Sequence, residues 1–115
     1  MTEAFLQYIW QYQLIEGSLV TTDGLAVRVV HAGMLNRDAG PDFFNASVEI
    51  GGILWVGNVE IHVSASSWMQ HGHDTDPMYN NVVLHVVYDA NAKAFTSDGR
   101  ELATVCLKPF IADAL

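Results

Sequence analysis

Apolar and polar residues alternate most regularly between residues 44 and 63. Apolar residues occupy every second position up to Ile50, Gly51-Gly52 interrupts the pattern, and the alternation then resumes. Since successive side chains of a strand point to opposite faces, this pattern predicts two strands joined by a tight turn. The second strand then carries Glu60 and His62 together on a mostly polar face.

Local patterns elsewhere predict one helix and further strands. Apolar residues follow a helical period after Thr2, whose side chain is a suitable N-cap. The Asp23-Gly24 pair favours a hairpin turn, because such a turn needs a positive φ angle. The predicted elements are a helix over residues 2–13, strands over 19–22, 25–31, 44–50, 53–63, 82–89, 94–96 and 101–107, a polar loop over 33–40, and a loop or short helix over 64–81. This order predicts an α+β fold, in which an N-terminal helix precedes a mainly antiparallel, twisted sheet of about seven strands.

The length and composition indicate one globular domain that spans residues 1–115. Half of the 115 residues are hydrophobic and 16% are charged, which is typical of a folded protein. No apolar run reaches the roughly 18 residues of a membrane-spanning helix, and the first residues lack the basic region of a signal peptide. With one cysteine, Cys106, in an apolar strand pattern, these features favour a bacterial-type cytoplasmic protein without a membrane partner.

The formal net charge of −8 constrains the partners. Lys and Arg together number only five and are scattered along the chain: Arg28, Arg37, Lys93, Arg100 and Lys108. Nucleic-acid binding normally uses clustered Lys and Arg side chains, which displace counterions from phosphates. Nucleic acid is therefore a disfavoured partner unless metal ions neutralise an acidic site.

Two short motifs bring carboxylates and an imidazole into the central hairpin. Pro41-Asp42 precedes its first strand, and Glu60 and His62 lie two residues apart in its second strand. Asp42 and Glu60 are suitable ligands for Mg²⁺ or Mn²⁺, and His62 is suited to orient the attacking water in phosphodiester hydrolysis. The alternative is that Pro41-Asp42 ends a turn while Glu60 and His62 merely face solvent.

This pattern resembles the PD-(D/E)xK superfamily of restriction-endonuclease-like proteins, whose motif is Pro-Asp, a hairpin and then Asp/Glu-x-Lys. The resemblance implies an acidic residue from the preceding helix, for which Glu3 is the candidate. His62 stands where that superfamily usually has lysine, which is a departure at the water-activating position.

The predicted register makes a structural demand on this hypothesis. A two-residue turn at Gly51-Gly52 sets Asp42 opposite Ile61, away from the face that carries Glu60. A one-residue bulge, for which Gly57 is suited, would realign Asp42 with the polar face, opposite His62. If the two carboxylates lay on opposite faces of the sheet, they could not share a metal ion.

Four of the five histidines fall in one part of the chain: His62, His71, His73 and His85. With Asp74 or Asp76 they offer enough donors for a Zn²⁺, Mn²⁺ or Fe²⁺ site. His85 interrupts an apolar strand, and a buried imidazole needs a polar partner. A structural His85 bonded to a carbonyl or carboxylate is the alternative, and Asp76-Pro77 is also typical of a turn or helix start.

Five longer segments, at residues 5–10, 35–43, 57–62, 68–74 and 79–88, resemble an uncharacterised bacterial domain-of-unknown-function family, DUF2851. The resemblance covers nearly the whole chain and implies no particular activity. It implies that the chain is the N-terminal part of a longer protein, because the family members are considerably longer. Residues 110–115 would then begin a further element.

Together these observations favour a metal-dependent phosphodiesterase or nuclease-like enzyme, in which Asp42 and Glu60 bind the metal and His62 orients water. The side chains expected to complete or flank the cleft are His71, His73, Asp76 and His85. The alternatives are a non-catalytic metal- or ligand-binding module and a plain interaction domain. The exposed edges of a sheet of short strands also make a homodimer a reasonable hypothesis.

Overall fold

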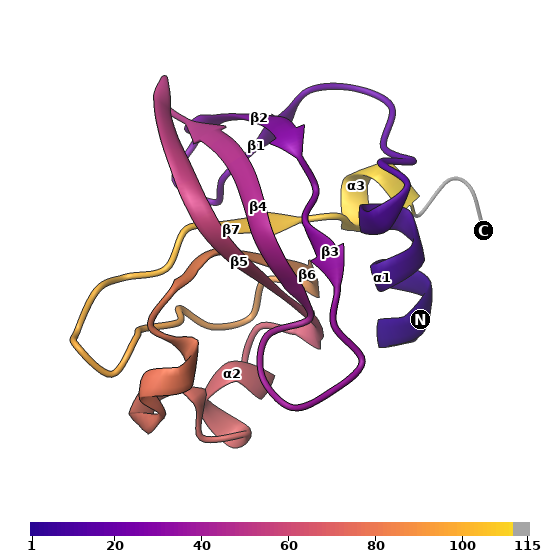
Figure 1. Cartoon of the computed structure of the whole chain (residues 1–115). Helices are drawn as coiled ribbons and strands as arrows, with labels where there is room; N and C mark the ends of the chain where they lie inside the picture. The colour runs from indigo at the N-terminus through magenta and orange to yellow at the C-terminus, as the bar shows by residue number, and fades with distance from the viewer. Residues whose placement is uncertain (112–115) are drawn as a thin grey trace.

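The computed structural model describes residues 1–111, and Figure 1 shows the order of its elements. The helices and strands are α1 (Glu3–Gln11), β1 (Leu19–Val20), β2 (Ala26–His31), β3 (Met34–Leu35), β4 (Phe43–Ile50), β5 (Ile53–Ser64), α2 (Ser67–Gln70), the 3₁₀ turns η1 (His73–Thr75) and η2 (Pro77–Tyr79), β6 (Val82–Asp89), β7 (Thr104–Cys106) and α3 (Lys108–Ile111). Residues 112–115, most of the predicted last element, lie outside the described residues.

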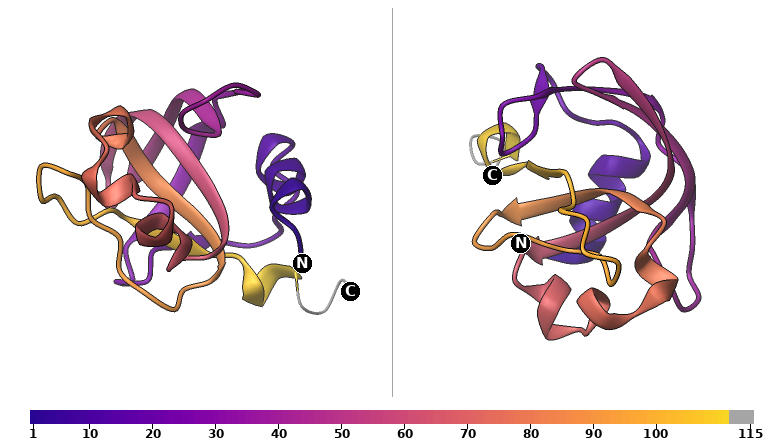
Figure 2. Two further views of the ribbon diagram at one scale, coloured as in Figure 1. Left: turned by 90° about the horizontal axis from the view of Figure 1, so that it is seen from below. Right: turned by 90° about the vertical axis from the view of Figure 1, so that its left-hand side faces the viewer.

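The seven strands form one sheet in the order β1-β2-β4-β5-β6-β7, with β3 paired to β4. This sheet is strongly curved (Figure 2). A bridge between Thr21 and Val105 brings the two ends of this order together, so the sheet is nearly a closed barrel. The pairings from β1 to β5 are antiparallel, whereas β5–β6 and β6–β7 are parallel. The α+β class was therefore predicted correctly in outline, but the sheet is mixed.

The parallel pairing follows from one long connection between β5 and β6. Residues 65–81, here called the crossover, contain α2, η1 and η2 and return the chain to the end of the sheet where β5 began. A strand that starts there must run in the same direction as β5. The prediction of a mainly antiparallel sheet assumed hairpin connections only, and the crossover is the reason that it is incomplete.

Two short segments also differ from the prediction. Met34 and Leu35 pair with β4 inside the segment predicted as a polar loop. Residues 94–96 form no strand, because Phe95 makes a single bridge to Glu101 and the chain turns at once. The Thr96 hydroxyl is bonded to the Asp98 carboxylate in that turn, which leaves no room for a longer ladder.

The main core lies between α1 and the sheet. Leu6, Ile9 and Trp10 of α1 are buried, and the Trp10 indole donates a 3.0 Å hydrogen bond to the carbonyl of Ala32. Thr2 caps the helix as predicted, since its hydroxyl accepts from the Phe5 amide. A smaller buried cluster lies under the crossover and consists of Trp68, Tyr79, Val82, Ala94 and Leu102.

The two faces of β5 serve these two regions. Val59 and Ile61 belong to the main core, whereas Glu60 and His62 project from the opposite face, where residues of the crossover meet them. Within residues 1–111, no helix has the length and apolar character needed to span a membrane.

Candidate functional site

A bulge in β4 places Asp42 beside Glu60. From Ile50↔Ile53 to Ala46↔Gly57 the hairpin keeps the register set by its two-glycine turn, but Phe43 pairs with Val59. One extra residue therefore lies in β4, where Asn45 has a φ angle of 59°. Asparagine tolerates this left-handed conformation better than most residues do.

The predicted bulge exists, but its predicted position at Gly57 is wrong. Because the extra residue lies in β4, the shift brings Asp42 level with Glu60 and not with His62. Gly57 serves another purpose, since a Cβ atom there would lie 2.5 Å from the carbonyl oxygen of Asn81. The glycine lets the start of β6 approach β5 closely.

The two carboxylates are held by directional hydrogen bonds. The Asp42 amide donates to Glu60 Oε1 at 3.1 Å, and the Ile61 amide donates to Asp42 Oδ2 at 2.7 Å. Gln7 of α1 donates from Nε2 to Asp42 Oδ1 at 3.1 Å. Both Asp42 oxygens are thus occupied by donors of this chain, which leaves Glu60 Oε2 as the oxygen that faces the imidazoles.

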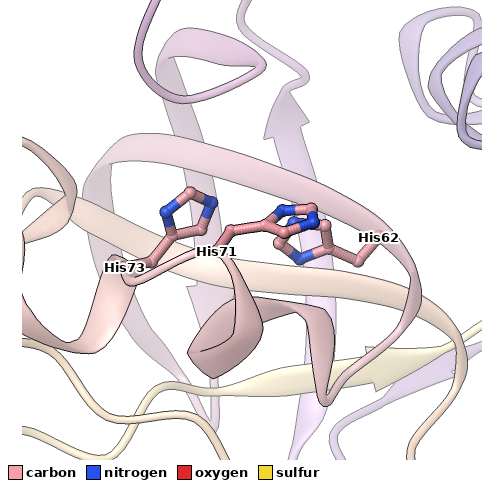
Figure 3. Close-up of side chains that lie close together, drawn as sticks. All are labelled: His62, His71 and His73. Carbon is pink, nitrogen blue, oxygen red and sulfur yellow. The ribbon is translucent and has the colours of Figure 1, made fainter.

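Two imidazoles approach that oxygen, and a third lies beside them. His73 Nε2 lies 2.9 Å and His62 Nε2 lies 3.5 Å from Glu60 Oε2. One nitrogen each from His62, His71 and His73 lies within 4.8 Å of the other two, so the three side chains are close enough to hold a metal ion (Figure 3). His62 comes from β5, whereas His71 and His73 come from the crossover. His71 is exposed and the other two are buried, so the cluster is open on one side.

Glu60 and His62, on the polar face of β5, are buried, contrary to the alternative in which they face solvent. Glu60 is 4% exposed and His62 is 1% exposed. His62 Nδ1 lies 2.8 Å from Nε2 of the fully buried His85, so the partner of His85 is another histidine and not a carbonyl or carboxylate. The second ring nitrogen of His85, Nδ1, is buried without a partner among the described residues.

Aromatic rings from the crossover form the wall of the site. Tyr79 stacks on the His73 ring with 3.7 Å between ring centroids and 17° between ring planes. Trp68 packs against His73 at 5.2 Å and against His85 at 5.3 Å, and its indole donates to the carbonyl of Phe95 at 2.8 Å. These contacts fix the rings of His73 and His85 in place.

Burial shifts the proton equilibria of the site in two directions. Desolvation, together with the neighbouring carboxylate of Glu60, raises the pKa of Asp42 to about 8. Desolvation also raises the pKa of Glu60 to about 7. For His62 and His85 burial lowers the pKa to about 3, with nearby imidazoles as the second cause. Burial likewise lowers the pKa of His73. At neutral pH these imidazoles are uncharged, and a neutral ring can bind a metal through its one unprotonated nitrogen when that nitrogen accepts no hydrogen bond.

The outlying candidates have different roles. Asp76 accepts from the Met78 amide at 3.0 Å and caps η2, so it lies outside the group that could hold a metal among residues 1–111. Glu3 is exposed but close enough to interact with the site. Its pKa is raised, first by partial burial and then by Asp42, while His71 and His73 act in the opposite direction.

Gln7 and Tyr79 are side chains of the site that were not predicted from the sequence. Gln7 lies one helical turn after Glu3, the candidate that the superfamily resemblance indicated, so the two side chains share one side of the helix and the spacing was the available signal for Gln7. The stacking of Tyr79 on His73 depends on the conformation of the crossover, for which the sequence carried no periodic signal.

A comparison with protein families identifies one match. The model of a family described as "Protein of unknown function (DUF2851)" matches residues 3–115. No curated protein and no solved structure matches the chain.

Proposed function

Since the chain belongs to the family DUF2851, whose description assigns no activity, we propose its function from the side chains of the site: a metal-dependent hydrolase that cleaves short phosphodiesters. The observation that carries the proposal is that the hydrogen-bonded pair of half-buried Asp42 and buried Glu60 lies against the imidazole cluster of His62, His71 and His73. A metal ion and a carboxylate base at one place are the two parts that hydrolytic water activation requires.

The donor set favours a transition metal over Mg²⁺. Mg²⁺ prefers six oxygen ligands, whereas neutral imidazoles bind Zn²⁺ and the neighbouring first-row ions well. His62, His71 and His73 would supply the nitrogen ligands, with Glu60 Oε2 as a fourth ligand or as the base beside it. Asp42 is then not a metal ligand, because both of its oxygens already accept hydrogen bonds from Gln7 and Ile61. Its role is to hold Glu60 in position through its backbone amide.

The surroundings of the site support a small substrate. The cluster is open at His71, which gives a substrate access to the metal position. The net charge of −8 and the lack of a basic cluster oppose the binding of a long polyanion. A short phosphodiester carries a single charge that one divalent ion can neutralise.

The contact between His85 and His62 also supports the proposed metal site. His85 contacts His62 Nδ1 and thereby orients the Nε2 atom toward Glu60. Metal-binding histidines commonly have their second ring nitrogen held in this way by a neighbouring polar group. The alternative of a non-catalytic metal module uses the same ligands and differs only in whether water at the open side becomes reactive.

The first experiment is a titration of the metal-free protein with Co²⁺, followed by visible absorption spectroscopy. We expect saturable binding with the intense bands of a four- or five-coordinate site. The His71→Ala and His73→Ala variants should lose at least about tenfold in affinity. The matched control is His31→Ala, because His31 is an exposed strand histidine outside the cluster. Binding that persists unchanged in both site variants would refute the proposed ligands.

The second experiment measures turnover of bis(p-nitrophenyl) phosphate by the Zn²⁺- and Mn²⁺-loaded protein. We expect Glu60→Gln to retain its fold and to lose about a hundredfold in rate, a typical contribution of a general base. The exposed Glu16→Gln is the control. Metal binding without turnover of any phosphodiester would favour the non-catalytic module.

A further inference from the structure

The first four residues of β5, Ile53–Val56, form a free strand edge, here called the β5 edge. They pair on one side with β4, whereas the pairing of β5 with β6 begins only at Asn58. Figure 1 shows the corresponding geometry, because the β4–β5 hairpin projects beyond the end of β6. Within residues 1–111, no other strand pairs with the second side of the β5 edge.

The backbone groups that point away from β4 can be assigned. The Asn58 amide donates a 2.8 Å hydrogen bond to the carbonyl of Asn81, so Asn58 directs its backbone groups away from β4. Because this direction alternates along a strand, Val56 and Leu54 direct their N–H and C=O groups the same way. The β5 edge therefore offers the donors and acceptors of two residues to an added strand.

The side chains of this edge are apolar and exposed. Ile53, Leu54, Trp55 and Val56 are exposed by 63%, 57%, 38% and 65%. Natural sheet edges are usually protected by lysine, proline or a bulge, and the β5 edge has none of these. Leu25 lines a groove together with Ile53 and Trp55, and Met34 lines a second groove together with Trp55 and Val56. The apolar surface of the β5 edge therefore continues into both grooves.

We propose that the β5 edge pairs with the β5 edge of a second copy of this chain, in an antiparallel two-fold dimer. Leu54 would face Val56 of the partner subunit as a hydrogen-bonded pair, and the symmetry would repeat this pair. Trp55 then lies on the two-fold axis, opposite the partner's Trp55, in a pair without backbone hydrogen bonds. This is the position at which cross-strand side chains come closest.

Charge and area favour a second copy as the occupant. The chain carries a net charge of −8, yet residues 50–58 contain no charged residue. The charged side chain beside Trp55 is the cation of Arg100, which lies 5.9 Å from the ring centroid, so no carboxylate of residues 50–58 opposes the association of two acidic molecules. The exposed side chains of the β5 edge, Leu25 and Met34 present on the order of 600 Å². That is about a tenth of the 6221 Å² surface, the share that an ordinary interface covers on a small protein.

The dimer does not depend on the proposed metal chemistry. Ile53–Val56 lie in the first half of β5, whereas Glu60 and His62 lie in the second half. A failure of dimerisation therefore leaves the proposed hydrolase untouched, and a failure of metal binding leaves the dimer untouched.

Sedimentation velocity of the chain, from about 1 to 200 μM, gives the oligomeric state across ordinary non-obligate affinities. We expect a concentration-dependent dimer that Val56→Lys converts to a monomer, because the substitution places like charges at the seam. The control Val30→Lys alters a valine of β2 that is 51% exposed and lies outside the β5 edge, and it should leave the dimer intact. Far-ultraviolet circular dichroism should be the same for all three proteins.

Disulfide trapping tests the register directly. With Cys106 replaced by Ala, Trp55→Cys should form a covalent dimer under mild oxidation. A central pair of this kind has Cα atoms about 4.5 Å apart, which a disulfide can bridge. Ile53→Cys should not, because the two copies of residue 53 are displaced along the strands by four residues.

Three results would overturn the proposal. A wild-type chain that stays monomeric at about 200 μM has no second copy on this edge, whether or not an extended apolar peptide binds there instead. A dimer that persists in Val56→Lys uses another surface. Trapping through residue 53 and not through residue 55 excludes the two-fold register centred on Trp55.

Discussion

The two halves of β5 reverse the ordinary distribution of polar and apolar residues. In the first half, Ile53–Val56, the apolar side chains are all exposed. In the second half, Glu60 and His62 are 4% and 1% exposed. Folded proteins normally bury the first kind of side chain and expose the second. One continuous strand therefore contains both exceptions, and Gly57 lies between them.

Neither exception is explained by the stability of the chain alone. A buried carboxylate costs free energy unless it has good partners, and an apolar strand edge promotes association. Buried polar groups and exposed apolar strands are expected at binding sites, where contacts with a ligand or a partner offset the lower local stability. The comparison teaches that both halves of β5 depart from the ordinary pattern, while Val59 and Ile61 on the other face of its second half pack in an ordinary core.

The largest effect on stability should come from Gly57→Ala, at the boundary between the two halves of β5. The added Cβ atom would lie 2.5 Å from the Asn81 carbonyl oxygen and 2.6 Å from Val83 Cγ1, so the start of β6 must move away. We expect a loss of about 3 kcal/mol in the free energy of unfolding, measured by urea denaturation. Gly52→Ala is the control: its Cβ atom meets nothing within 4 Å, and the φ angle of +83° alone should cost about 1 kcal/mol. Equal losses in the two variants would contradict the close approach.

The next largest effect concerns the buried second half of β5. It is measured with a double-mutant cycle on His62 and His85, in the presence of a chelator that keeps the protein metal-free. His62→Leu leaves His85 with two unpaired ring nitrogens in a site that is 0% exposed, which should cost about 2 kcal/mol. Replacing both histidines with leucine removes the unpaired groups, so the double variant should be at least as stable as the wild type. All these variants should lose metal binding. A double variant that is less stable than the wild type would contradict this expectation and show that the histidine pair contributes to the stability of the fold.

The third effect concerns the pH dependence of the metal-free protein. The pKa of Asp42 is about 8 in the folded chain and near 3.8 when unfolded, and that of Glu60 is about 7 against 4.5. Between these values the folded state holds protons that the unfolded state has lost, so stability falls as the pH rises toward 8. His62 and His85, with a pKa of about 3 against 6.5, lower stability only as the pH falls below 6.5.

We therefore expect the free energy of unfolding to decline above about pH 6.5, by on the order of 1 kcal/mol for Asp42 after allowance for its partial exposure. Asp42→Asn should remove most of this slope in urea titrations at several pH values. Asp38→Asn, in the exposed loop before it, should leave the slope unchanged. A slope that is identical in all three proteins would mean that Asp42 is ionised in the folded chain throughout this range.

Much of the fold follows from local patterns. The helical period and the cap at Thr2 predicted α1, and the alternation around Gly51-Gly52 predicted the β4–β5 hairpin. The parallel position of β6 was not predicted, because it depends on how the crossover packs, and residues 65–81 show no regular period. Propensity patterns report neighbours in sequence, whereas the order of strands is decided by contacts between distant residues.

The candidate site was predicted as a set of residues but not as an arrangement. The structure brings Asp42, Glu60 and the four histidines of the cluster together, and it assigns Asp76 to a cap. The bulge that permits this was expected at Gly57 because glycine adopts the backbone conformations of a bulge easily. Asn45, the residue that has the positive φ angle, was overlooked, since one asparagine in an alternating strand is a weak signal.

The crossover has a consequence for the order of events in folding. His71 and His73 reach Glu60 and His62 only after residues 65–81 have closed and β6 has docked beside β5. Contacts of this kind, which close a long loop onto a parallel strand, tend to form late. An ion bound by these side chains would then be absent from the folding transition state. It would leave the folding rate almost unchanged and slow unfolding, so that its main benefit to the protein is a longer lifetime of the folded chain.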